Sequence, residues 1–219
     1  RTVDAFKALC SIPYLNLLYT RENMNSEDAK GTFNEMISRL VNERPPSLQS
    51  FCGLSAGETT LEIAGARESD AILVASDLEH NTSIRELRIR GIAHSKIFEA
   101  LPLSSSLTSL DVSGSRSPST FQISVDLLVA ALPKLTTFAA RNTHLQRRSF
   151  ISITTAAYHS PKLVSLDLSC NPLALVTRRS LRGHIGSRNV KVFTKGNKYL
   201  EDQEARRTAS AEDDEDGSD

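Results

Sequence analysis

The sequence has little of several residue types that mark other classes of protein. It contains no tryptophan, only 5% aromatic residues and three cysteines. No apolar run approaches the roughly 20 residues that a membrane-spanning helix needs. Cys10, Cys52 and Cys170 lie far apart and form neither a CxxC pair nor the even-numbered framework of small secreted domains. We therefore expect a soluble, cytoplasmic protein of a reducing compartment that does not associate with membranes.

Signatures of known chemistry are also missing. The chain has no phosphate-binding G-x-x-x-x-G-K-[ST] loop, no G-x-G-x-x-G turn after a strand and no G-x-S-x-G elbow. No two of the five histidines stand at metal-ligand spacing with cysteine or carboxylate neighbours. We expect neither an enzyme nor a cofactor or metal site.

The net charge is zero but unevenly distributed. Residues 201–219 hold nine Asp or Glu against two Arg, a balance of −7, so that residues 1–200 carry +7. The segment has no apolar periodicity, which predicts a disordered acidic tail. The tail serves solubility, or alternatively folds back electrostatically over the basic body. Within it, Ser210 follows two arginines and is a candidate phosphorylation site.

A motif of the form L-x-x-L-x-L-x-x-N recurs four times in the middle of the chain. Its second apolar position is occupied by Leu87, Leu110, Phe138 and Leu166, which are separated by 23, 28 and 28 residues. Weaker copies lie 26 residues outside this series on either side, centred on Leu61 and Val192, and less regular candidates lie at 48–54 and 12–20. The pattern predicts six to eight short strands with alternate side chains pointing inward, each followed by a turn where the Asn-position side chain bonds the next repeat.

Segments with helical spacing of apolar residues separate these strands. They cover 71–78 after a Ser69-Asp70 cap, 97–101, 121–132 after a Ser119-Thr120 cap, 150–158 and 176–185. A further helix, capped within Asn25-Ser26-Glu27-Asp28, is expected to run to about Val41, with Arg44-Pro45-Pro46 as its stop. An ordinary α/β domain also alternates strand and helix, but its strands are usually continuous Val/Ile runs and its ligand loops Gly-rich, and neither feature is present.

The segments Ser106–Gly114 and Lys162–Asn171 resemble leucine-rich repeats of the ribonuclease-inhibitor-like subfamily. The resemblance covers roughly residues 48–197 and implies an α/β leucine-rich-repeat solenoid, a horseshoe with parallel concave strands and convex helices. Its members include ribonuclease inhibitors, nucleotide receptors, tropomodulins and activators of the GTPase Ran. The fold alone therefore implies binding of a macromolecule without naming it.

Side chains that flank the inward apolar positions must point to the concave face. From this alternation we predict a partner-binding strip of Arg88, Arg90, Asp111, Arg141, Asp167 and Phe193. The alternative is that these charges solvate the sheet and pair with one another, Arg88 or Arg90 with Asp111 or Glu62. Nucleic acid is not the expected partner, because the basic residues are dispersed and aromatic residues are few.

The chain divides into an irregular N-terminal repeat or helical segment (1–47), a solenoid (48–200) and the acidic tail (201–219). Because the first candidate strand lies close to Arg1 without a polar capping unit before it, we expect further repeats upstream in a longer protein. The function we predict is that of a protein-binding scaffold or adaptor. Alternatives are a GTPase regulator like the Ran activators, or a structural part of a cytoskeletal or ciliary complex.

Overall fold

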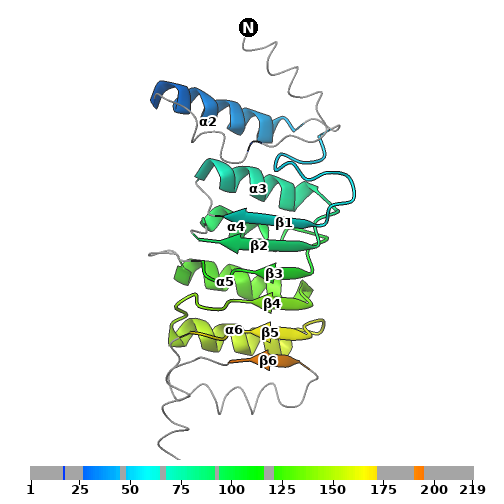
Figure 1. Cartoon of the computed structure of the whole chain (residues 1–219), viewed down its shortest axis with the longest axis vertical. Coiled ribbons are helices and arrows are strands. Elements are labelled where there is room, and N and C mark those ends of the chain that lie inside the picture. Colours follow the sequence, from blue (N-terminus) through cyan, green and yellow to red (C-terminus); the bar gives the residue numbers. More distant parts are fainter. Residues whose placement is uncertain are drawn as a thin grey trace, which may run out of the picture.

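A computed structural model describes residues 17, 27–44, 48–64, 68–91, 94–115, 121–171 and 190–194 of the chain. Over these residues the protein is an α/β structure in which strands and helices largely alternate (Figure 1). Its elements are α2 (Glu27–Asn42), β1 (Thr60–Ala64), α3 (Glu68–His80), β2 (Glu86–Arg90), α4 (Ser95–Ala100), β3 (Ser109–Asp111), α5 (Phe121–Ala131), the 3-10 turn η2 (Leu132–Lys134), β4 (Thr137–Ala139), α6 (Arg147–His159), β5 (Ser165–Asp167) and β6 (Lys191–Phe193).

The six strands form one parallel sheet whose spatial order, β1 to β6, is the order of the chain. One row of register partners runs across all six strands, through Leu61, Leu87, Leu110, Phe138, Leu166 and Val192. These are the positions that the recurring motif aligns, so the predicted register is confirmed. The sheet has the lower number of strands in the expected range.

The helices that the structure describes cover one face of the sheet (Figure 1). Along β1 and β2 every second side chain is buried, and those between are exposed or half-buried. The helices α2 to α6 pack each against the next along the chain, in a row beside the sheet (Figure 1). Buried side chains of both layers, including Phe51, Phe98, Phe138 and Phe150, form one apolar cluster between them. No helix in the described part of the chain is long and apolar enough to cross a membrane.

Most of the predicted helices are present, with some differences at their ends. Helix α3 begins at Glu68, so Ser69 and Asp70 lie inside its first turn and the predicted cap is wrong. Helix α6 begins at Arg147, earlier than the predicted start at Phe150, because polar residues can form the first turn of a helix. The helix predicted over 176–185, the cap before 121 and the tail lie outside the described residues.

Of the two less regular strand candidates, the segment 48–54 does not join the main sheet, and the other is described at one residue only. The segment 48–54 contains only isolated bridges at Ser50 and Cys52. In the candidate at 12–20 only Leu17 is described, and its N–H donates to the carbonyl oxygen of Phe51 at 3.0 Å. The two segments therefore meet through the backbone.

The turns after four successive strands, β2 to β5, use the same backbone conformation. Gly91, Gly114, Asn142 and Cys170 follow β2, β3, β4 and β5 and have φ angles of 78°, 71°, 50° and 59°. This left-handed region favours glycine, and asparagine tolerates it better than most residues. The chain thus leaves successive strands in the same direction.

Behind these turns the consensus Asn position holds a buried polar side chain. Ser115 and Thr143 each donate a hydroxyl hydrogen bond to a carbonyl three residues earlier. Asn171 reaches further: its Oδ1 accepts from the N–H groups of Thr143 at 3.0 Å and Leu145 at 3.2 Å, and its Nδ2 donates to the Ala140 carbonyl at 2.7 Å. The sequence led us to expect contacts with the following unit, and this is wrong: Asn171 bonds the segment after the preceding strand, β4.

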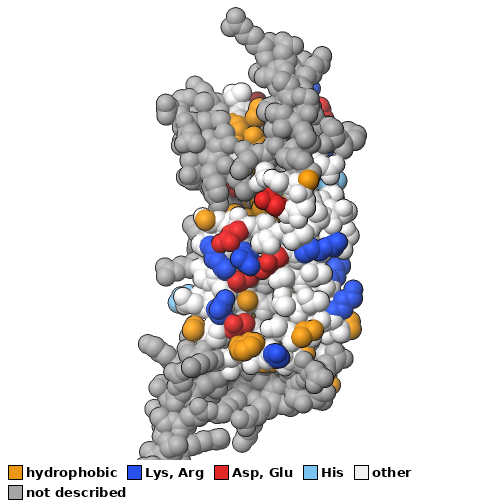
Figure 2. All heavy atoms as spheres, turned by 45° about the vertical axis from the view of Figure 1, so that its right-hand side comes forward, with side chains coloured by type: hydrophobic (Ala, Val, Ile, Leu, Met, Phe, Trp, Pro, Cys, Tyr) orange, Lys and Arg blue, Asp and Glu red, His pale blue; other side chains and the backbone are white. Residues whose placement is uncertain are grey.

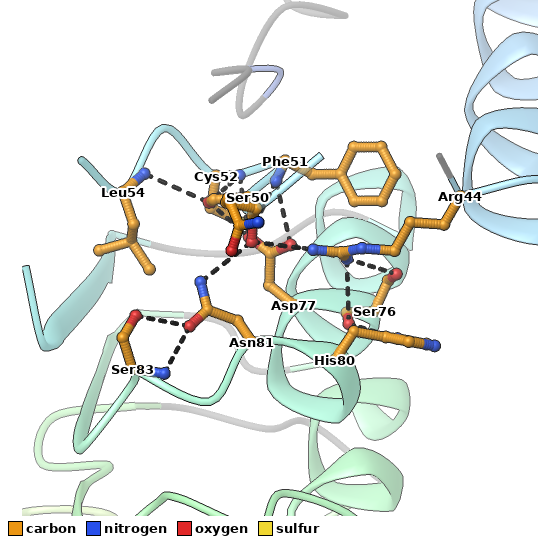
Figure 3. A network of polar contacts seen from close by, with 11 residues as sticks. Arg44, Ser50, Phe51, Cys52, Leu54, Ser76, Asp77, His80, Asn81 and Ser83 are labelled. Atoms are coloured by element: carbon orange, nitrogen blue, oxygen red, sulfur yellow. Dashed lines mark hydrogen bonds and ion pairs between the residues drawn. The ribbon is translucent and has the colours of Figure 1, made fainter. Parts of the chain in front are cut away.

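A buried carboxylate joins the segment 48–54 to helix α3 (Figure 3). Asp77 is completely buried, and its two oxygens accept hydrogen bonds from the Ser50 hydroxyl at 2.7 Å and from the N–H groups of Phe51 and Cys52 at 3.0 Å. Arg44 completes the shell with a guanidinium nitrogen 3.0 Å from Oδ1. One side chain thereby satisfies backbone groups that no strand pairing reaches.

The guanidinium group of Arg44 has further partners besides Asp77. Its guanidinium donates to the carbonyls of Ser76 at 3.2 Å and Gln49 at 2.9 Å, and it lies over the ring of Phe51 at 4.8 Å from the centroid. Asn81 also donates to the Gln49 carbonyl, at 3.1 Å. The residue therefore fixes the exit from α2 against α3 and acts as a structural cation.

Candidate functional site

The uncovered side of the sheet is the largest surface that the fold leaves to a partner. We call it the open face. It consists of three rows of side chains: Thr60, Glu86, Ser109, Thr137, Ser165 and Lys191; Glu62, Arg88, Asp111, Ala139, Asp167 and Phe193; and Ala64, Arg90, Ser113, Arg141 and Ser169. The second and third rows are the positions predicted from the sequence, and the six predicted site residues all lie on this face.

At the β1–β2 end, one arginine holds two glutamates. The Nε of Arg88 donates to Glu86 at 2.9 Å, and its Nη1 lies 3.8 Å from Glu62. The hydrogen bond to Glu86 and its charge raise the pKa of Arg88. Thr60 donates its hydroxyl to the second oxygen of Glu86 at 3.2 Å.

At the centre of the open face, two arginines share one aspartate. Arg90 donates to Asp111 at 2.8 Å. Arg141, which follows β4, lies 4.0 Å from the same oxygen of Asp111 and 3.5 Å from Asp167 on β5. Partial burial acts to raise the pKa of Asp111, but hydrogen bonds from Arg90 and Ser113 outweigh it and lower the pKa to about 2. Asp111 is therefore ionised throughout the physiological range.

The charges of the open face are arranged as a ladder: Arg88 and Glu86 pair within β2, and the other pairs link adjacent strands (Figure 2). Figure 2 shows these red and blue side chains interleaved over the sheet. The pairing that the sequence left open as an alternative is thus present, for Arg88 with Glu62 and for Arg90 with Asp111. Arg141 keeps 52% of its side chain exposed, the most among the three arginines, so it can contact a partner without first losing a buried bond.

Beyond the charged ladder, strand β6 places an exposed aromatic ring on the open face, in the same strand as the exposed Lys191. Phe193, the register partner of Asp167, exposes 48% of its surface. Ala139 lies between Asp111 and Asp167 in the same row and leaves a shallow position there. An exposed aromatic ring is typical of residues that carry binding energy at interfaces.

The sequence reasoning did not identify the first row of the open face. Glu86 is the main partner of Arg88, and Lys191 is exposed beside Ser165, yet neither was expected there. The alternation could have identified them, because the same period of two that points Arg88 outward also points Glu86, two positions earlier, outward.

The histidines of the described segments do not gather at one place. Four of the five histidines are described, at helix ends or turns: His80 and His159 end α3 and α6, His94 caps α4, and His144 lies in a turn. Within the described ranges no group of three or more His, Cys, Asp or Glu side chains is placed to hold a metal ion. Ser210 and Lys195 lie outside those ranges.

Comparison with known proteins gives no assignment. The chain matches no protein-family model, and no curated protein sequence matches it significantly.

Proposed function

We propose that the chain is a leucine-rich-repeat array of the ribonuclease-inhibitor-like kind that binds a protein partner through the open face. The observation that carries the proposal is a parallel sheet covered on one face only. Parallel sheets are almost always buried on both faces, because their crossover helices lie on either side. In the described part of the chain the helices follow one side, and on the other side every strand presents side chains that are exposed (β1, β6) or half-buried (β2 to β5).

The repeat architecture draws support from three regularities. Strands pair in chain order, equivalent apolar residues share one row, and the turns after four successive strands adopt the same left-handed conformation. Stacked repeats require each unit to contact its neighbours alone, and this pairing fulfils that requirement.

The chemistry of the open face favours a folded protein as the partner. Its arginines are balanced by carboxylates on adjacent strands, so it offers little net attraction to a polyanion such as nucleic acid. A protein with both charges and an apolar patch can instead insert its own charges into the ladder and cover Phe193. On this proposal the chain is an adaptor or scaffold within a larger protein or assembly, and its role is binding without catalysis.

A photo-crosslinking experiment tests the binding face. We would place p-benzoylphenylalanine at Ala139, in the centre of the open face, and at Arg148, an exposed position of α6, as the matched control. In native extract the probe at 139 should crosslink to a discrete polypeptide that the probe at 148 does not reach. Adding Arg141→Glu should reduce that product by about tenfold or more. Identical products from both positions would contradict the proposal.

Removal of one repeat tests the architecture. Deleting residues 138–165 joins Thr137 to Leu166, so that β5 takes the register of β4. In a repeat array the units on either side of the deletion can still pack against each other, so the shortened chain should still unfold cooperatively. Its free energy of unfolding should be lower, because the contacts of one unit are lost. Complete loss of cooperative unfolding would indicate a domain with a single indivisible core.

A further inference from the structure

A second charged surface lies at the edge of the sheet where the strands begin. We call it the basic edge. It contains Arg85, immediately before β2, Lys134, at the end of η2, and Lys162, before β5, all of them exposed. Lys134 and Lys162 belong to the same tripeptide, Pro-Lys-Leu, 28 residues apart, and so occupy equivalent positions before adjacent strands.

Two of these cations converge on one short segment. Arg85 donates to the Ser106 carbonyl at 3.0 Å, and Lys134 approaches the same stretch of chain from the other side, donating to the carbonyls of Pro102 and Ser104. These contacts position the side chains but leave their charges uncompensated. Leu103, in the middle of the segment, exposes 58% of its surface.

The basic edge differs from the open face in having no acidic partners among the described residues. The cations of the open face are each paired with a carboxylate, whereas Arg85, Lys134 and Lys162 form no ion pair with any described side chain. Glu86, which follows Arg85 in the chain, is paired with Arg88, and Glu58, before β1, accepts a hydrogen bond from the Ser55 N–H. In Figure 2, blue side chains without red neighbours lie to the right of the mixed column. Such a surface attracts an anionic segment.

We propose that the basic edge binds the chain's own acidic segment, residues 201–219, and thereby limits the access of other acidic peptides. Charge complementarity selects this occupant: the segment carries −7, with five consecutive acidic residues at 212–216. Leu103 and Val164, which is 53% exposed, offer apolar contacts beside the cations.

The connection is long enough for this contact. Residue 212 follows the end of β6 by 19 residues. A flexible chain of that length has an end-to-end distance of about 25 Å and an extended reach of about 60 Å. Strands are about 4.8 Å apart, so Lys134, beside β4, lies within that range of β6. Tethering gives the acidic run an effective concentration in the range of about 1 mM, which compensates for weak individual ion pairs.

Competition with a peptide in trans provides the test. A fluorescent peptide of residues 201–219 would be titrated into the native chain and into a full-length variant neutralised in the acidic run, with Glu212→Gln, Asp213→Asn, Asp214→Asn, Glu215→Gln and Asp216→Asn. The neutralised chain should bind the peptide about tenfold more tightly, because the native segment already occupies the site. Raising the salt concentration should weaken binding to both.

Charge reversal locates the site. In the neutralised background, Lys134→Glu with Lys162→Glu should abolish peptide binding, whereas Arg148→Glu on α6, a matched exposed charge, should leave it unchanged. In the native chain, zero-length carbodiimide crosslinks should join Lys134 or Lys162 to carboxylates of 212–216 and disappear at high salt. Equal peptide affinity of native and neutralised chains, or crosslinks that avoid both lysines, would overturn the proposal. It stands independently of the open face.

Discussion

Replacing Asp77 by Asn tests whether one buried carboxylate attaches the segment 48–54 to α3. The substitution keeps the size of the side chain but removes its charge and turns one acceptor oxygen into an N–H₂ donor. That donor then faces Arg44 or the backbone N–H groups of Phe51 and Cys52, which donate to the Asp77 carboxylate; the Cys52 N–H also contacts the Ser50 hydroxyl oxygen, at 3.0 Å. Breaking a buried ion pair by changing one partner costs about 3–5 kcal/mol. We expect a loss of stability in this range.

The loss should appear first as local opening, and Cys52 reports it. Its thiol is buried, and burial raises its pKa well above the ordinary value, so it is protonated and shielded from thiol reagents. Cys170 is exposed and provides an internal reference. In a Cys10→Ser background, Asp77→Asn should accelerate labelling of Cys52 by about 100-fold, the factor that corresponds to about 3 kcal/mol. Labelling of Cys170 should not change.

Asp126→Asn, on an exposed position of α5, is the matched control and should affect neither thiol. The reasoning would be refuted if Asp77→Asn left the free energy of unfolding within about 0.5 kcal/mol of the native value and Cys52 protected. A uniform loss of stability without local opening would show that the segment 48–54 unfolds together with the rest of the sheet. In that case the attachment would be part of the common core.

Three further predictions concern the turns and the open face. Gly114→Ala should destabilise the protein by about 1 kcal/mol, because φ is 71° at this position, even though a Cβ would meet no atom there. The control Gly31→Ala, inside α2, should stabilise the protein, and chemical denaturation of both variants measures the difference. Asn171→Ala should cost about 2–3 kcal/mol, because it strands the Thr143 and Leu145 N–H groups, and their amide exchange should accelerate. Because the pKa of Asp111 is lower in the folded protein, the unfolded chain binds a proton at this carboxylate first as the pH falls. The free energy of unfolding should therefore drop by about 2 kcal/mol between pH 4 and pH 2. Asp111→Asn should make the free energy of unfolding depend less on pH in this window.

The sequence predicted the features that depend on alternation within short segments. Leu87, Leu110 and Phe138 mark strands because each belongs to a period-two pattern, and aligning these copies yields the register directly. The outward charges follow from the same alternation. The ion pairs between Arg90 and Asp111 were predicted as an alternative, since adjacent strands bring equivalent positions within reach of a long side chain.

Features that depend on contacts between unlike segments were not predictable in this way. Asp77 looks like one acidic residue in an otherwise apolar helix, and its partners lie 25 to 27 residues away in a segment without a regular pattern. The basic edge was missed for a different reason: Lys134 and Lys162 precede their strands, outside the motif, so that only the structure shows which side of the sheet they share. Repeated units make equivalent positions predictable, but the irregular connections between units carry their own information.

The chain-ordered pairing of the strands has a consequence for the kinetics of folding. Every register pair in the sheet joins residues separated by only 23 to 28 positions. Because the entropy of loop closure grows slowly with loop length, each pair closes at nearly the same cost. In this sheet no strand pairs with a segment that is far away in the sequence, unlike the central strands of most parallel sheets. Folding can therefore start at any adjacent pair and extend in both directions, and the unit that starts first will be the one with the most favourable local contacts.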